Sequence, residues 1–171
     1  NYKKITIIVF AVFVISAVSW KVYDYSSNTK NYSTGMYESE INYISNSNSS
    51  ADKFITTLHE QLAVYPGNSK LLTKLGAAYI QKARESNDPE FYSLAEEVLN
   101  RAIKTEPGNF LAMAELGSVY LSRHHFREAL ELAQKALDMN PFSAYTYGVL
   151  VDALVELGNY DEAVQNVQKM I

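Results

Sequence analysis

Residues 107–141 read PGNFLAMAELGSVYLSRHHFREALELAQKALDMNP, and this stretch decides the fold. The prolines that bound it, Pro107 and Pro141, are 34 residues apart. Proline stops a helix because it lacks a backbone N–H and clashes with the preceding turn. Apolar residues recur at helical spacing on either side of His124-His125. Two helices in a period of this length predict a helical-repeat protein, whose repeats stack into an extended surface.

Residues 110–143 resemble a tetratricopeptide repeat (TPR). The family pattern has a large apolar residue, then Leu-Gly-x-x-Tyr on the first helix, and alanines on the second helix before a closing proline. The matching positions are Met113, Leu116-Gly117, Tyr120, Ala129, Ala133, Ala136 and Pro141. Glycine and alanine are expected where the paired helices approach most closely, because a larger side chain would push them apart. The resemblance implies an all-α fold, a TPR-type α-solenoid of antiparallel helix pairs.

Two further units carry the same pattern with departures. Residues 69–109 contain Leu75-Gly76 but span 41 residues, seven more than the period. We expect the excess in a loop over residues 85–91, where Asp88-Pro89 is typical of a helix start. Residues 144–171 form a third, incomplete unit without a closing proline.

Residues 52–65 predict a helix that caps the array. Large apolar side chains recur along it at helical spacing and should face the first full unit. These side chains are Phe54, Leu58, Leu62 and Tyr65. His59 lies next to Leu58 and is expected at the surface or at the edge of the core. With the three units, the cap makes residues 51–171 one TPR domain.

The charge of the chain argues against a nucleic-acid partner. The 171 residues carry a net charge of −4, and residues 51–171 hold 11 basic and 16 acidic side chains without a basic stripe. Affinity for nucleic acid depends on clustered cations. The chain has no cysteine, which excludes disulfides, thiolate metal sites and cysteine nucleophiles.

Residues 1–25 predict a single transmembrane anchor. Residues 5–20, ITIIVFAVFVISAVSW, contain only three polar side chains, and residues 5–22 would contact the lipid bilayer. A cleaved signal peptide is the competing interpretation, because Ala17-Val18-Ser19 is a small-x-small site. Lys3-Lys4 favours a cytoplasmic N-terminus, which places the TPR domain in the periplasm or outside the cell.

Residues 26–50 predict a flexible stalk between the anchor and the repeats. They contain eight serines and five asparagines with few aliphatic side chains. Such a segment has too little apolar surface to offset the entropy of ordering. A spacer is therefore the expected role.

The resemblance also implies a binding groove. In the family, the first helix of each unit lines a concave groove, and fixed positions on it meet the ligand. These positions are Lys70, Thr73, Ala77, Leu111, Ala114, Ser118, Tyr145, Asp152 and Glu156, with Ile80, Gln81, Leu121, Ser122, Gly148 and Val155 as further members. We expect an apolar or weakly basic helix or peptide, with Tyr145 as anchor and Asp152 and Glu156 as charge partners. Alternatively, Tyr145 only stabilises the last unit.

No residues are expected to act as catalysts, cofactor ligands or metal ligands. The sequence has no G-x-S-x-G elbow, no glycine-rich phosphate loop and no H-E-x-x-H motif. His124, His125 and Glu128 fall at an inter-helix turn without a further ligand, which argues against a metal site. The acidic pair Glu96-Glu97 is interpreted as a solvated face. We therefore expect a protein that is not an enzyme.

These features favour a membrane-anchored TPR adaptor or scaffold that mediates protein–protein interaction and assembles an envelope complex. The layout is similar to that of anchored periplasmic TPR proteins of cytochrome c maturation, and this resemblance implies presentation of a peptide to a partner enzyme. Two alternatives stay open. One is a structural accessory subunit of a larger membrane complex, and the other is the non-catalytic part of a longer enzyme.

Overall fold

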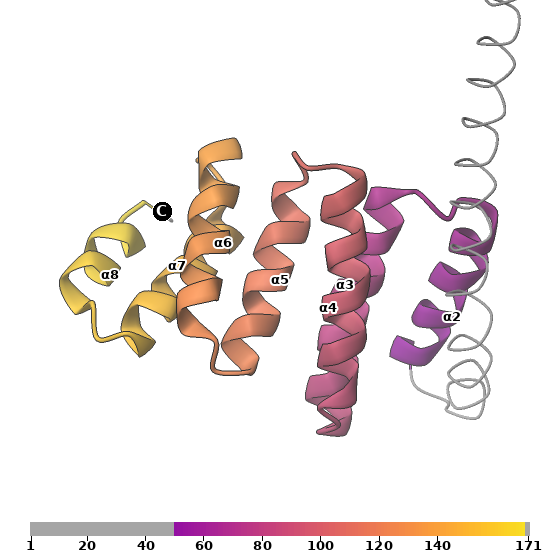
Figure 1. The fold of residues 1–171 in the computed structure, drawn as a ribbon. Helices are drawn as coiled ribbons and strands as arrows, with labels where there is room; N and C mark the ends of the chain where they lie inside the picture. The colour runs from indigo at the N-terminus through magenta and orange to yellow at the C-terminus, as the bar shows by residue number, and fades with distance from the viewer. Residues whose placement is uncertain (1–49, 170–171) are drawn as a thin grey trace, which may run out of the picture. The chain divides into compact units, whose positions relative to one another are not determined.

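Helices account for all regular structure in residues 50–169, the part of the chain that the computed structural model describes. Short connections make consecutive helices antiparallel, and the helices follow one another along an array (Figure 1). They are α2 (Ser50–Val64), α3 (Ser69–Ser86), α4 (Glu90–Thr105), α5 (Phe110–Ser122), α6 (Phe126–Met139), α7 (Ala144–Glu156) and α8 (Tyr160–Val167). The pairs α3–α4, α5–α6 and α7–α8 coincide with the three predicted units.

The predicted anchor, residues 1–25, lies outside the described residues, as does the predicted stalk up to residue 49. The last predicted stalk residue, Ser50, already belongs to α2, so the cap helix begins two residues earlier than predicted. None of the helices in residues 50–169 is both long and apolar enough to cross a membrane. The anchor stays a prediction from the sequence.

The first helix of each unit begins at a capping residue. Asn68, Asn109 and Ser143 accept a hydrogen bond from the backbone N–H three residues later, at 3.1, 3.0 and 3.3 Å. Such a cap satisfies an N–H that the first helical turn leaves free and is worth about 1 kcal/mol. Asn109 also links two units, because its Nδ2 donates to Ser69 Oγ at 2.7 Å and to Thr73 Oγ1 at 2.9 Å.

Small residues lie at close helix contacts, as predicted. Ala129, Ala133 and Ala136 have no exposed surface. A Cβ added to Gly76 would lie 2.5 Å from Leu99 Cγ on α4, so a larger residue would separate α3 from α4. At Gly117 the tightest contact is instead 2.9 Å from Val149 Cγ1 on α7. Gly117 therefore mainly permits close contact with the next unit.

The cap helix α2 packs on α3, but with a different face from the predicted one. Leu58 and Leu62 are buried as expected, whereas Phe54 and Tyr65 are 50% and 62% exposed. Ile55, fully buried, occupies the core in place of Phe54. Phe54 and Ile55 are adjacent, and either one could face the core together with Leu58 and Leu62. Helical spacing alone does not show which of the two is buried.

Polar contacts also hold α2 on α3, and one of them corrects a prediction. His59 is buried rather than at the surface, and its Nε2 lies 2.8 Å from Tyr79 Oη in a hydrogen bond. Burial, and then the charge of Arg101, lower the pKa of His59 from 6.5 to about 4. Asp52, also buried, pairs with Lys82 Nζ at 2.7 Å.

The seven extra residues of the first unit lengthen its helices instead of forming the predicted loop over residues 85–91. The α3 helix has 18 residues and α5 has 13, while α4 has 16 and α6 has 14. The connection between α3 and α4 is only residues 87–89, the same length as residues 123–125 between α5 and α6. Most of the difference in length between the two units lies in α3. This helix continues to Ser86, more than one turn beyond the equivalent end of α5.

Candidate protein-binding groove

The predicted groove positions lie on α3, α5 and α7, but they differ in exposure. Thr73, Ala114 and Ser118 are buried, and Ala77 is half-buried. Thr73 Oγ1 donates to the Ser69 carbonyl at 2.9 Å and accepts from Asn109, so this hydroxyl serves the packing of the two units. The exposed positions are Lys70, Leu111, Tyr145, Asp152 and Glu156. These five are available to a ligand in the structure as it stands.

Tyr145 on α7 is joined to α5. Its hydroxyl donates to Glu115 Oε2 at 2.9 Å, while the side chain as a whole remains 44% exposed. Burial raises the pKa of Glu115, against the opposing effects of the Tyr145 hydrogen bond and the Arg84 charge. Burial and the neighbouring Glu115 raise the pKa of Tyr145. Tyr145 is therefore partly exposed and also bonded to the preceding unit, so the structure is compatible with either of the two predicted roles.

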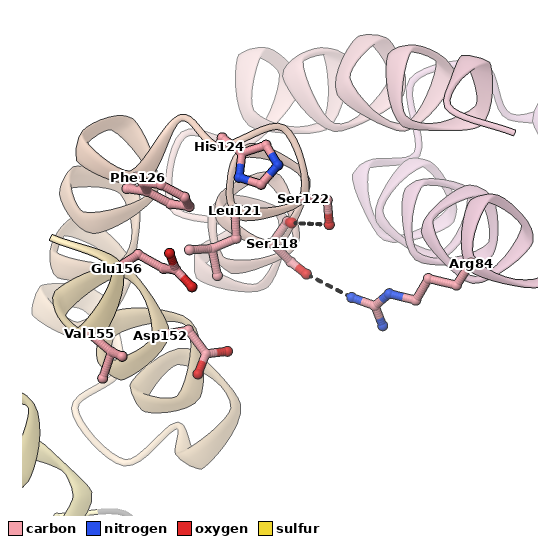
Figure 2. Close-up of a pocket in the computed structure, with 9 residues that line it drawn as sticks. All are labelled: Arg84, Ser118, Leu121, Ser122, His124, Phe126, Asp152, Val155 and Glu156. Atoms are coloured by element: carbon pink, nitrogen blue, oxygen red, sulfur yellow. Dashed lines mark hydrogen bonds between the residues drawn. The ribbon is translucent and has the colours of Figure 1, made fainter. Parts of the chain in front are cut away.

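A pocket of about 340 Å³ opens beside these residues. Figure 2 shows Asp152 and Glu156 of α7 on one side, Arg84 of α3 on the other, and α5 between them. The Arg84 Nη2 donates to Ser118 Oγ at 3.2 Å across the space between α3 and α5. The full lining is Arg84, Ser118, Leu121, Ser122, His124, Phe126, Asp152, Val155 and Glu156.

The structure brings Ser118, Asp152 and Glu156 together in this pocket. The other exposed groove positions, Lys70, Leu111 and Tyr145, lie outside its lining. Arg84 was not predicted as a groove residue, because the family positions end before it. Its place follows from the length of α3, since α5 and α7 each have only 13 residues and end earlier in their units. The sequence signal for Arg84 would have been the length of α3, because a helix that reaches Ser86 includes this residue.

Glu96 lies on α4 and His125 lies immediately before α6, and both are close to charged side chains. Glu96 is not only a solvated residue, because it pairs with Arg123 and accepts a hydrogen bond from Tyr120 Oη at 3.4 Å. His125 Nδ1 lies 3.7 Å from Glu128 Oε1. Across residues 50–169 there is no group of three or more histidine or acidic side chains that could hold a metal ion.

The repeats match known proteins. Residues 88–144 and 114–170 each match the family model described as tetratricopeptide repeat. MamA from Desulfovibrio magneticus RS-1 has a TM-score of 0.59 at 21% identity, over 70% of this chain and 64% of that chain. A second structure, MamA AMB-1, has a TM-score of 0.56 at 26% identity, over 70% of this chain and 66% of that chain.

Curated relatives are much longer proteins. Superkiller complex protein 3 of Homo sapiens is 35% identical over 80 residues, which are 47% of this chain and 5% of that protein. Sperm-associated antigen 1 of Rattus norvegicus is 26% identical over 137 residues, 79% of this chain and 15% of that protein. The chain thus spans only a small part of the length of these relatives.

Residues 50–169 therefore form a TPR-like solenoid of seven α-helices, and residues 88–170 of the chain match tetratricopeptide repeats. The repeat class predicted from Pro107, Pro141 and the small residues between them is confirmed. The likeness in layout to cytochrome c maturation proteins stays a prediction, because it depends on the N-terminal segment.

Proposed function

We propose that the protein is a TPR scaffold that binds a segment of a partner protein along α3, α5 and α7. The observation that carries the proposal is the pocket beside α7, where two exposed carboxylates, Asp152 and Glu156, lie next to apolar side chains. Neither carboxylate forms a hydrogen bond or ion pair within residues 50–169. Charged groups that the fold leaves uncompensated in a hollow are typical of a binding site.

The similar proteins support the same role. TPR arrays act by presenting an extended surface made of successive repeats. The name of Superkiller complex protein 3 refers to a protein complex. MamA has a fold similar to that of this chain. Peptide recognition in a groove uses a few anchoring side chains and a polar rim, which the half-exposed Tyr145 and the carboxylates of α7 supply.

The proposal extends to the membrane. Residues 1–25 would anchor the scaffold and residues 26–49 would give the repeats reach, so that they organise partners of an envelope complex on the periplasmic or outer side. The apolar run of residues 5–20 and its flanking lysines support this arrangement. Alkaline extraction of membranes should leave the full chain in the pellet. Release into the supernatant would overturn the anchoring part alone.

Crosslinking mass spectrometry on the full chain in intact membranes tests the scaffold itself. We expect partner crosslinks from Lys70 and Lys74 on α3 rather than from Lys135 on α6, which is exposed on the second helix of a pair. The double substitution Tyr145→Ala with Asp152→Lys should abolish these crosslinks. Unchanged crosslinking in that variant would contradict the proposal. A partner retained in fixed stoichiometry through a salt wash would favour the accessory-subunit alternative.

A further inference from the structure

The pocket has walls of opposite charge. Asp152 and Glu156 are four residues apart on α7, so their side chains lie on the same face, one helical turn from each other. Arg84 supplies the cation of the opposite wall, from the part of α3 that extends beyond the length of α5. Neither carboxylate has a basic partner within residues 50–169, a property shared with other exposed acids there, but these two also line a pocket.

Apolar side chains lie between the charged walls. Leu121 and Phe126 are half-buried and Val155 is exposed, and all three line the pocket (Figure 2). Its volume of about 340 Å³ is within the range of pockets that hold small ligands. Lysine and arginine cover apolar surface with their aliphatic stems while the charged head stays in a polar environment. A long basic side chain therefore fits both parts of the lining.

We propose that this pocket binds an arginine or lysine side chain of a partner peptide, with its charged head at Asp152 and Glu156. Its stem lies against Leu121 and Phe126, and Arg84 donates to a carbonyl or carboxylate oxygen of the same peptide. The inference depends on the proposed scaffold function and adds the chemistry of the partner. Because one wall attracts a cation and the other attracts an oxygen acceptor, the peptide binds in one direction.

Two dipeptides that differ only in charge test the inference. The probes are N-acetyl-leucyl-arginine amide and its citrulline analogue, in which a neutral urea replaces the guanidinium. Each is titrated into the full chain of 171 residues while backbone amide chemical shifts are followed. We expect the arginine probe to shift amides of residues 118–126 and 152–156. Citrulline should bind roughly fivefold to tenfold more weakly, because two exposed ion pairs are lost, and added salt should remove the difference.

Matched variants assign the effect to the two carboxylates. Asp152→Asn with Glu156→Gln keeps the side-chain shapes and should reduce arginine binding to the level of citrulline. The control, Glu131→Gln with Asp138→Asn, neutralises two exposed acids of α6 outside the pocket and should leave binding unchanged. Asp152→Lys with Glu156→Lys should reverse the preference, so that N-acetyl-leucyl-glutamate amide binds better than the arginine probe.

The outcomes separate this inference from the scaffold function. Equal binding of arginine and citrulline probes in the pocket would overturn the basic-residue inference and leave peptide binding in the groove intact. Binding of neither probe, or shifts confined to other helices, would overturn the inference as well. The scaffold function is tested separately, and it fails if the crosslinks from α3 are not seen or if they persist in the Tyr145 and Asp152 variant.

Discussion

The first and second repeat units have the same fold and different lengths. The first helix of the first unit, α3, has 18 residues, whereas α5 in the second unit has 13. The additional turn of α3 carries Lys82, which pairs with Asp52 of the cap helix, and Arg84, which reaches Ser118 of α5. Lengthening a repeat within its helices, while the connection keeps its length, adds contacts to both neighbours without interrupting the stack.

Equivalent positions in the two units make the comparison experimental. Tyr79 and Tyr120 occupy the same position, but Tyr79 bonds to buried His59, while Tyr120 bonds to Glu96. Gly76 and Gly117 are also equivalent and lie against different helices. Substitutions at such pairs distinguish contacts that both units share from contacts that only one of the two units makes.

The largest effect is expected from Lys82→Met in the extended part of α3. The change removes a cation from the buried carboxylate of Asp52, and breaking a buried pair from one side costs about 3 kcal/mol. Chemical denaturation of the full chain, followed by circular dichroism, measures the loss in the free energy of unfolding. Lys74→Met, at an exposed lysine of α3, is the control and should change it by less than about 0.5 kcal/mol.

A double-mutant cycle shows whether the pair itself is responsible. Asp52→Asn combined with Lys82→Met should recover part of the loss, because no buried charge is then left without this cation. If Lys82→Met costs no more than the Lys74 control, the extension does not hold the cap helix. The first unit would then differ from the second in length only.

His59 should make the stability of the cap dependent on pH. Its pKa is about 4 in the folded chain against 6.5 ordinarily, so between these values the unfolded chain binds a proton that the folded chain does not. The contribution of His59 is complete above pH 6.5 and is lost as the pH falls toward 4, by about 2–3 kcal/mol. Unfolding free energies of the wild type and His59→Gln, measured from pH 7.5 to 4.5, should therefore converge or cross on acidification.

The second unit supplies the contrast, because Tyr120 bonds to a carboxylate where Tyr79 bonds to an imidazole. His125→Gln, at an exposed histidine beside Tyr120, is the matched histidine variant and is measured over the same pH range. The prediction would be wrong if the unfolding free energies of wild type and His59→Gln changed with pH in parallel. Protonation of His59 would then cost the folded chain no stability. The buried hydrogen bond to Tyr79 would then contribute no pH dependence.

The two equivalent glycines should respond differently to alanine. In Gly76→Ala the new Cβ meets Leu99 Cγ, a branch point with little freedom, and overpacking should exceed the gain in helix propensity by about 1–2 kcal/mol. In Gly117→Ala the tightest contact of the new Cβ is longer, 2.9 Å from Val149 Cγ1 against 2.5 Å from Leu99 Cγ at Gly76, so the net loss should be below about 1 kcal/mol. Gly108→Ala, with no atom within 4 Å of the new Cβ, is the control. Thermal unfolding ranks the three, and an equal loss at Gly76 and Gly117 would contradict the ranking.

The helix boundaries were predictable because the same local signal precedes each unit. Pro66-Gly67-Asn68, Pro107-Gly108-Asn109 and Pro141-Phe142-Ser143 all place a proline two residues before a capping side chain. The end of α3 was not predictable in this way. Residues 82–86 contain neither glycine nor proline, and the signal that ends α3 lies just after them, where Asn87 adopts a left-handed conformation with φ +53° before Asp88-Pro89.

The helices that carry the predicted groove positions could be assigned from the sequence, whereas the exposure of those positions could not. The family positions found Asp152 and Glu156, which are exposed and line the pocket. They also selected Thr73 and Ala114, which are buried, because a position on a helix does not state how closely the neighbouring helix approaches. Arg84 depends on the length of α3, and His59 on the angle at which α2 packs. Both are tertiary properties.

The smallest effect concerns the connections between paired helices, where a histidine and a glycine adopt the same conformation. His124 has φ +62° and Gly158, 34 residues later, has φ +78°. Each donates its N–H to the carbonyl three residues earlier at 3.0 Å, and the residue after each donates to the carbonyl five residues before it at 2.8 Å. The two turns are therefore the same structure made with different residues, and only glycine adopts this φ without strain.

His124→Gly should raise the free energy of unfolding by about 0.5–1 kcal/mol, because it removes the left-handed penalty of a residue with a Cβ. Gly158→Ala is the matched reverse change and should lower it by a similar amount. The His124 ring makes an edge contact with Phe126 at 5.5 Å between centroids, which opposes the gain. If both His124→Gly and Gly158→Ala destabilise the chain, the contact between the His124 and Phe126 rings outweighs the backbone strain at His124. The second unit would then retain a strained histidine because its ring, together with Phe126, forms a wall of the pocket.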